Sequence, residues 1–144
     1  MEKDINSLIR EYFEEKEVDV RTYSPLAFAY IGDGVFDLII RTIVVGRGNT
    51  QTNKLHYRTS HIVKAHTQAE MIQKLLPYLT EEEQNIYRRG RNAKSSTVAK
   101  NATPSDYRKA TGFEALLGYL YLTGDFERIL FLVKEGIGQL GERI

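Results

Sequence analysis

Cysteine and tryptophan are absent from the 144 residues, and proline occurs only three times. Without cysteine the chain forms no disulfide and offers no thiolate metal ligand or cysteine nucleophile. A long apolar run is also missing, because the longest stretch contains Asp37 and Arg41 and is too short to cross a bilayer. The charged first residues have no apolar signal-peptide core. We therefore expect a single cytoplasmic domain over residues 1–144, with no membrane segment.

Charge is nearly balanced over the whole chain but is unevenly distributed along it. Twenty Lys and Arg against 19 Asp and Glu give a formal net charge of +1. Residues 1–20 hold seven acidic and three basic side chains, whereas residues 88–109 hold seven basic and one acidic, a local charge of +6. Such a concentration of positive charge favours a polyanionic partner.

The spacing of apolar residues predicts an all-α fold, a bundle of six to seven helices. Capping residues mark several helix starts, among them Ser24 before Pro25 and Thr103 before Pro104. The predicted helices are an acidic N-terminal helix within residues 1–20, then residues 25–45, 52–76, a short helix from 81, 104–122 and a last helix from 126. A basic loop is expected over residues 90–102, and three glycines predict a frayed tail over residues 136–144.

Two otherwise apolar helices each contain one carboxylate near a glycine. Asp33 follows Gly32, and Glu114 lies two residues after Gly112. A glycine in a helix interior costs about 1 kcal/mol relative to alanine, and an unpaired buried carboxylate costs more or takes up a proton. These costs are offset if the glycines let two helices approach closely and the two acids share a divalent cation. The alternative is that each acid pairs with a basic side chain or a backbone amide.

Other candidate ligands and cofactor motifs are less specific. Asp37 lies one turn after Asp33, but Arg41 offers it an i,i+4 ion pair, which we favour over a metal role. The three histidines, at positions 56, 61 and 66, are spaced by five and do not share one helix face, which argues against zinc. No phosphate loop or dinucleotide fingerprint is present, so no nucleotide cofactor is expected.

The basic segment also contains hydroxyl and amide side chains and few aromatic ones. Arg, Lys, Ser and Asn side chains contact phosphates and sugars, whereas stacking on single-stranded bases requires aromatic rings. The composition therefore favours the backbone of an RNA duplex, recognised by shape. The candidate RNA-binding residues are Arg88, Arg89, Arg91, Asn92, Lys94, Lys100 and Arg108. The alternative for such a segment is an ordinary solvated loop.

Two segments of the sequence resemble known motifs. Residues 30–38, Tyr-Ile-Gly-Asp-Gly-Val-Phe-Asp-Leu, resemble the signature helix of the ribonuclease III catalytic domain, and residues 110–118 resemble the second acidic motif of that domain. The chain length, the Ser-Pro-Leu-Ala start at residues 24–27 and the Arg-Asn-Ala-Lys segment at residues 91–94 agree with mini-ribonuclease III. This short branch of the family has no double-stranded-RNA-binding domain, and the resemblance covers roughly residues 20–135.

The resemblance implies an all-α ribonuclease III-like fold, a homodimer, dependence on Mg²⁺ with Mn²⁺ as a substitute, and cleavage of double-stranded RNA to 5′-phosphate and 3′-hydroxyl ends. It also implies a role in maturation of the large-subunit (23S) ribosomal RNA precursor. Asp33 matches the catalytic aspartate of the family, and Glu114 matches its metal-binding glutamate. Larger members carry further acids at the positions of Leu26, Ala29 and Thr111, so we expect a single ion held by Asp33 and Glu114.

Two other functions stay open from the sequence. The missing acids fit a non-catalytic double-stranded-RNA-binding or ribosome-assembly protein on the same scaffold. The basic segment also fits a helical interaction domain that binds an acidic protein. Cleavage of duplex RNA in Mg²⁺ distinguishes the nuclease from the first, and retention of duplex RNA on a filter distinguishes it from the second.

Overall fold

The structure, a computed structural model, describes residues 4–93, 102–141 and 144. Within these residues the chain forms seven α-helices and two short 3₁₀ helices, with no strand, which confirms the all-α prediction. The helices are α1 (Ile5–Tyr12), α2 (Pro25–Gly46), α3 (Thr52–Val63), α4 (Ala65–Leu75), α5 (Glu81–Asn92), α6 (Pro104–Leu122) and α7 (Phe126–Gln139), with 3₁₀ helices at Val20–Thr22 and Leu76–Tyr78. In this described part no helix is both long and apolar enough to span a membrane.

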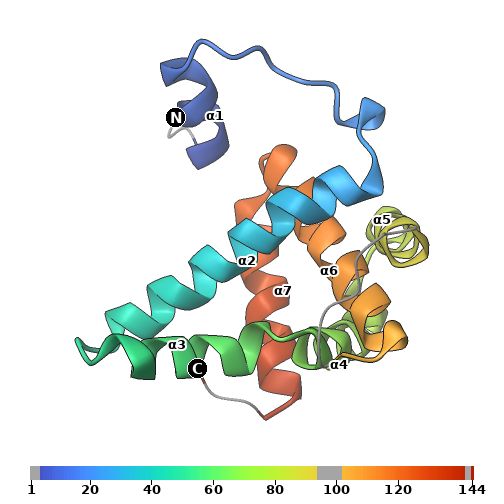
Figure 1. Cartoon of the computed structure of the whole chain (residues 1–144). Helices are drawn as coiled ribbons and strands as arrows, with labels where there is room; N and C mark the ends of the chain where they lie inside the picture. The colour runs from blue at the N-terminus through green and yellow to red at the C-terminus, as the bar shows by residue number, and fades with distance from the viewer. Residues whose placement is uncertain (1–3, 94–101, 142–143) are drawn as a thin grey trace.

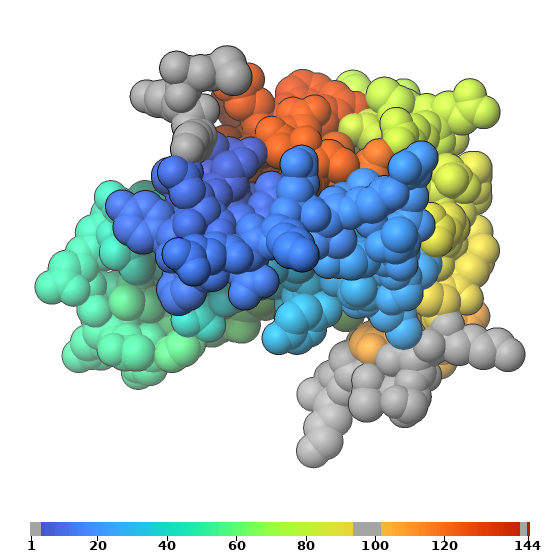
Figure 2. Space-filling view, turned by 90° about the horizontal axis from the view of Figure 1, so that it is seen from above, coloured from blue at the N-terminus to red at the C-terminus, as the bar shows by residue number. Residues whose placement is uncertain are grey.

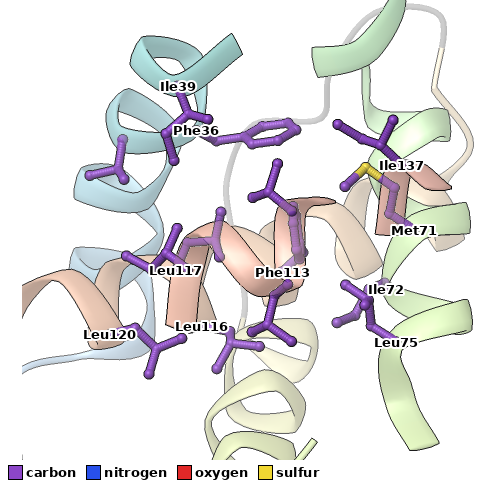
Figure 3. Packing of buried hydrophobic residues seen from close by; sticks show 14 of the residues in the cluster. Phe36, Ile39, Met71, Ile72, Leu75, Phe113, Leu116, Leu117, Leu120 and Ile137 are labelled. Carbon is purple, nitrogen blue, oxygen red and sulfur yellow. The ribbon is translucent and has the colours of Figure 1, made fainter. Parts of the chain in front are cut away.

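Helix α6 lies at the centre of the bundle, where it packs against α2, α4, α5 and α7 (Figure 1). Phe36 of α2 and Phe113 of α6 meet edge to face, with 5.4 Å between ring centroids. Met71 and Leu75 of α4 complete the same apolar cluster (Figure 3). All four side chains are fully buried. Because close-packed interiors resist displacement, this cluster fixes the orientation of α6 and therefore of Glu114, the residue after Phe113.

Helices α2 and α6 touch backbone to backbone where they cross. A Cβ atom on Gly32 would lie 1.8 Å from the carbonyl oxygen of Glu114, and one on Gly118 would lie 1.8 Å from the carbonyl oxygen of Phe28. Neither position can therefore carry a side chain unless the two helices move apart. The close approach that the glycines predicted is thus present, and Asp33 lies immediately beside it.

A second glycine contact joins α5 to α6. A Cβ atom on Gly90 would lie 2.9 Å from the Cα atom of Gly112 and 2.7 Å from the Cβ atom of Ala115. The other end of α5 is held by a buried ion pair, in which Arg128 Nη2 of α7 donates to Glu83 Oε1 at 2.8 Å. Helix α5 is therefore attached at both ends.

Helices α3 and α4 are separate where the sequence predicted one continuous helix, because the chain is extended at Lys64 (φ −63°, ψ 153°). A helix end leaves carbonyl groups without partners, and two side chains of α4 satisfy them. Thr67 Oγ1 donates to the His61 carbonyl at 3.0 Å, and Gln68 Nε2 donates to the Val63 carbonyl at 2.7 Å. The prediction failed because the apolar stripe continues across the break.

The N-terminal helix lies within the predicted residues 1–20, whereas the C-terminal end differs from the prediction. Helix α1 ends at Tyr12, because Glu14 adopts a left-handed conformation (φ 56°) that ends the helix. Helix α7 stays helical through Gln139, although its glycines predicted fraying from residue 136. Gly136 is buried, and a Cβ atom there would lie 3.0 Å from the Met71 methyl carbon, so this glycine permits close packing on α4.

The N-terminal segment lies across one face of the bundle (Figure 2). The Asn6 carboxamide donates to the carbonyl oxygens of Tyr121 and Leu122 at the end of α6, each at 3.4 Å. Apolar side chains of the same helix, including Ile9 and Tyr12, are exposed. Polar contacts to α6 therefore take part in holding α1, and much of its apolar face is left uncovered.

Replacement of Gly32 by alanine should destabilise the fold, because the new methyl group would overlap the Glu114 carbonyl oxygen. Overpacking of this kind costs about 1–3 kcal/mol, and each kcal/mol lowers the Tm of a chain of this size by about 2–4 °C. Gly138→Ala in α7 is the matched control, since the space around Gly138 is open and alanine is the better helix former. Scanning calorimetry should show a lower Tm for Gly32→Ala alone; equal Tm values would contradict the contact.

Candidate active site

The structure brings the two predicted acids, Asp33 of α2 and Glu114 of α6, together. Gly32 packs against the Glu114 backbone, and this contact places the neighbouring Asp33 next to the Glu114 side chain. Asp33 is exposed, whereas Glu114 is only partly exposed. The pair therefore lies at the edge of the bundle, with one carboxyl group facing solvent and the other more deeply placed.

The electrostatic surroundings of Glu114 are unusual for a carboxyl group. Its pKa is raised to about 9, chiefly by burial and in addition by the Asp33 carboxyl group, through a hydrogen bond and through repulsion between like charges. The Gln68 side chain acts in the opposite direction. Among the described residues neither acid forms an ion pair with a basic side chain. The pair thus lacks the positive charge that would let both groups ionise.

Gln68 of α4 is a third polar group at this pair, and the sequence analysis missed it. The side chain is buried, with 2% of its surface exposed. Its Nε2 atom lies 3.5 Å from Glu114 Oε2, and its Oε1 atom has no hydrogen-bond partner among the described residues. The available signal was a single amide between Ala65 and Ile72 on the apolar stripe of α4.

The donor set fits a small divalent cation such as Mg²⁺ or Mn²⁺. Two carboxylates are hard oxygen donors, and Mg²⁺ takes few protein ligands and keeps several waters. In the described part of the chain no group of three or more Asp, Glu, His or Cys side chains is placed to hold a metal ion. Thr111, at the position of a further acid in larger relatives, donates its hydroxyl to the Tyr107 carbonyl at 2.9 Å. Asp33 and Glu114 are thus the available acidic ligands in these residues.

Nearby titratable groups have other partners. Asp37 pairs with Arg41 at 2.7 Å, which confirms the ion pair that the sequence favoured. His66 bridges two helices, with Nδ1 2.9 Å from Asp106 Oδ2 and Nε2 2.5 Å from Glu70 Oε1. These contacts account for His66 without a metal ion.

The candidate RNA-binding residues of α5 lie on a helix, although part of this segment was predicted as a loop. Gly90 faces α6, so the helical repeat places Arg88 and Asn92 on the opposite side of α5, one turn apart. Arg89 and Arg91 lie on the two flanks between these faces, and the Arg91 guanidinium is 5.6 Å from the Tyr87 ring centroid. The segment was mistaken for a loop because it is almost wholly polar.

The other candidate cations are separated from these. Arg108 is exposed on α6, six residues before Glu114 and therefore about 9 Å from it along the helix axis. Lys94 and Lys100 lie outside the described residues. The structure therefore brings Asp33 and Glu114 together and places the α5 arginines on a helix that contacts α6 beside Glu114.

Comparison with known proteins gives consistent matches. A family model described as "Ribonuclease III domain" matches residues 26–125, a span that contains both acids. The Mini-ribonuclease 3 of Clostridium tetani is 45% identical over 130 residues, which are 88% of this chain and 86% of that protein. The Mini-ribonuclease 3 of Thermoanaerobacter sp. is 53% identical over 110 residues, 76% and 78% of the two chains. A crystal structure of a Fusobacterium nucleatum protein matches with a TM-score of 0.76 at 30% identity and covers 84% of this chain and 97% of its own.

The raised pKa of Glu114 predicts that, without a cation, the free energy of unfolding falls as the pH rises. From pH 4.5, its ordinary pKa, to about 9, the folded chain retains a proton that the unfolded chain releases, so ionisation opposes folding there. Glu114→Gln removes this effect. In EDTA at pH 8 its Tm should exceed that of the wild type, and the difference should vanish near pH 4.

Glu83→Gln is a control of opposite sign. Burial acts to raise the pKa of Glu83, but hydrogen bonds from Arg128 and Thr80 outweigh it and lower the pKa. This substitution should therefore reduce the Tm at pH 8. Scanning calorimetry across pH tests both variants; a Glu114→Gln variant that is less stable than the wild type in EDTA at pH 8 would count against a strained acid pair.

Proposed function

Because the chain belongs to the ribonuclease III family and is an endoribonuclease, we propose that it cleaves double-stranded RNA at Asp33 and Glu114 with the help of a divalent cation. Members of this family act on double-stranded RNA and generally depend on a divalent metal. The observation that carries the proposal is the meeting of two acids from different helices with no basic partner in the described residues. Such a pair destabilises the fold and offers two oxygen ligands to a cation.

The two acids have different tasks in this proposal. A bound Mg²⁺ supplies an activated water and stabilises the leaving oxygen of a phosphodiester. Asp33, which is exposed, and Glu114, which is more deeply placed, would hold the ion. Glu114 would release its proton to solvent in order to do so, because its pKa is raised. Hydrolysis joins a water oxygen to phosphorus and breaks the bond to the 3′ oxygen, which leaves 5′-phosphate and 3′-hydroxyl ends.

The basic residues bind the RNA backbone in this proposal. Exposed Arg88 and Arg89, with Arg91 on a flank of α5, present charge on a helix attached to α6 beside Glu114. Arg108 adds a cation on α6 itself. We also assign phosphate contacts to Asn92, Lys94 and Lys100. In this proposal these groups supply the electrostatic affinity for the RNA backbone.

The proposed assembly is a homodimer that uses the outer face of α2. Two large apolar side chains are exposed there, with 84% of Tyr30 and 54% of Leu38 accessible, and the space around Gly34 is open. Ribonuclease III proteins typically dimerise. Two active sites related by a twofold axis would cut the two strands of one duplex.

A finer proposal concerns the substrate. From the resemblance of residues 30–38 and 110–118 we propose a structured ribosomal RNA precursor, that of the large subunit (23S), processed in the cytoplasm. The missing acids at Leu26, Ala29 and Thr111 do not argue against catalysis, because two carboxylates suffice for an ion that keeps most of its waters.

Cleavage of a duplex RNA in Mg²⁺ tests the proposed activity. Wild-type protein should cut the duplex, EDTA should stop the reaction, and Asp33→Asn or Glu114→Gln should reduce the rate at least about a hundredfold, since an ion-holding group is lost. Gel mobility and end-labelling report cleavage and the chemistry of the ends. Intact RNA with wild-type protein that still binds the duplex would favour the non-catalytic RNA-binding protein.

The salt dependence of RNA binding tests the basic surface. Each phosphate contact that is lost should reduce the slope of log K against log salt by about one. Arg89→Gln should therefore weaken binding and lower this slope, with similar effects on duplexes of different sequence. Lys134→Gln removes an exposed cation from α7 and should leave the slope unchanged. Filter binding at several salt concentrations measures both, and equal slopes for all three proteins would exclude a contact by Arg89.

A further inference from the structure

The buried carboxamide of Gln68 connects two features that the proposed function does not link. One is the break between α3 and α4, whose Val63 carbonyl it satisfies, and the other is Glu114. A structural role at the break requires only the Nε2 hydrogen atoms. The chain nevertheless buries the whole amide, with 2% of the residue exposed, and leaves its oxygen unpartnered among the described residues.

The orientation of the amide is determined by its surroundings. The Val63 carbonyl is an acceptor only, and at 2.7 Å it requires a donor, so the nitrogen of Gln68 must face it. The same nitrogen carries a second hydrogen atom and lies 3.5 Å from Glu114 Oε2. Oε1 therefore cannot exchange places with Nε2 to find a partner. An unsatisfied buried acceptor destabilises the fold, and the break alone does not explain why the chain keeps one.

We propose that Gln68 is a positioning residue for the cation site. Its Nε2 group orients the Glu114 carboxylate, and its Oε1 atom accepts a hydrogen bond from a water molecule that the bound cation retains. This inference rests on the proposed function, because it needs a cation between Asp33 and Glu114. Groups that orient ligands in this way typically change metal affinity by about 10–100-fold when they are removed.

The test measures cation binding directly, without RNA. Mn²⁺ titrated into the full chain by calorimetry should bind the wild type, and Glu114→Gln should abolish that binding. Gln68→Met keeps the length of the side chain and removes both polar atoms, so it should weaken Mn²⁺ binding about 10–100-fold. With RNA present, the Mg²⁺ concentration for half-maximal rate should rise by the same factor, while the rate at saturating Mg²⁺ changes much less.

Thr67→Val is the matched control, since Thr67 also donates to a carbonyl at the break and is buried, with 5% exposed. A purely structural role would weaken Mn²⁺ binding equally in both variants; the proposal requires the loss in Gln68→Met only. Equal Mn²⁺ affinity of wild type and Gln68→Met overturns it. Wild-type protein that binds no Mn²⁺ overturns the proposed function as well, which distinguishes the two failures.

A measurement on the unmodified chain covers the case in which Gln68→Met does not fold. The side-chain amide resonance of Gln68 should shift on Mg²⁺ addition with the midpoint of cation binding, whereas that of Asn6, which contacts the far end of α6, should not. A Gln68 resonance unmoved at saturating Mg²⁺ would show that the amide does not respond to the cation and would refute the proposal.

Discussion

The contact between the backbones of α2 and α6 determines most of what this chain can do. Gly32 and Gly118 let the helices meet with carbonyl oxygens where side chains would normally stand. Because the contact involves backbone atoms, the positions of Asp33 and Glu114 follow from the path of the chain. Phe36 and Phe113 pack beside it and fix the rotation of both helices. The packing of α2 against α6 therefore keeps the two acids close together despite their mutual repulsion.

The fold accepts an electrostatic cost at this contact. Glu114 is kept from ionising by burial and by its neighbour, and among the described residues no basic side chain relieves it. Glu83 of α5 differs from Glu114, because its buried carboxyl group forms an ion pair with the Arg128 guanidinium. The same chain thus contains one buried acid whose charge is balanced by an arginine and, among the described residues, one acid without a basic partner, which is the proposed metal ligand.

The sequence predicted the all-α fold and both acids, because each depends on local signals: apolar spacing, caps, and an acid beside a glycine on an apolar helix. It could not show the break at Lys64, since the apolar stripe stays in phase across it. The polar sequence around Gly90 predicted a loop, although this glycine lies in α5 at its contact with α6. Polarity does not indicate which surface a helix packs against. Gln68 was missed for the same reason: its importance comes from Glu114, which is distant in sequence and near in space.

The joint between α3 and α4 has a mechanical consequence. The side chains of Thr67 and Gln68 donate hydrogen bonds to the carbonyl groups at the end of α3. These bonds fix the angle between the two helices. Helix α3 presents the exposed side chains of Tyr57 and Arg58 to solvent. The exposed face of α3 is therefore fixed relative to α4 and, through the contact of Gln68 with Glu114, relative to the acid pair.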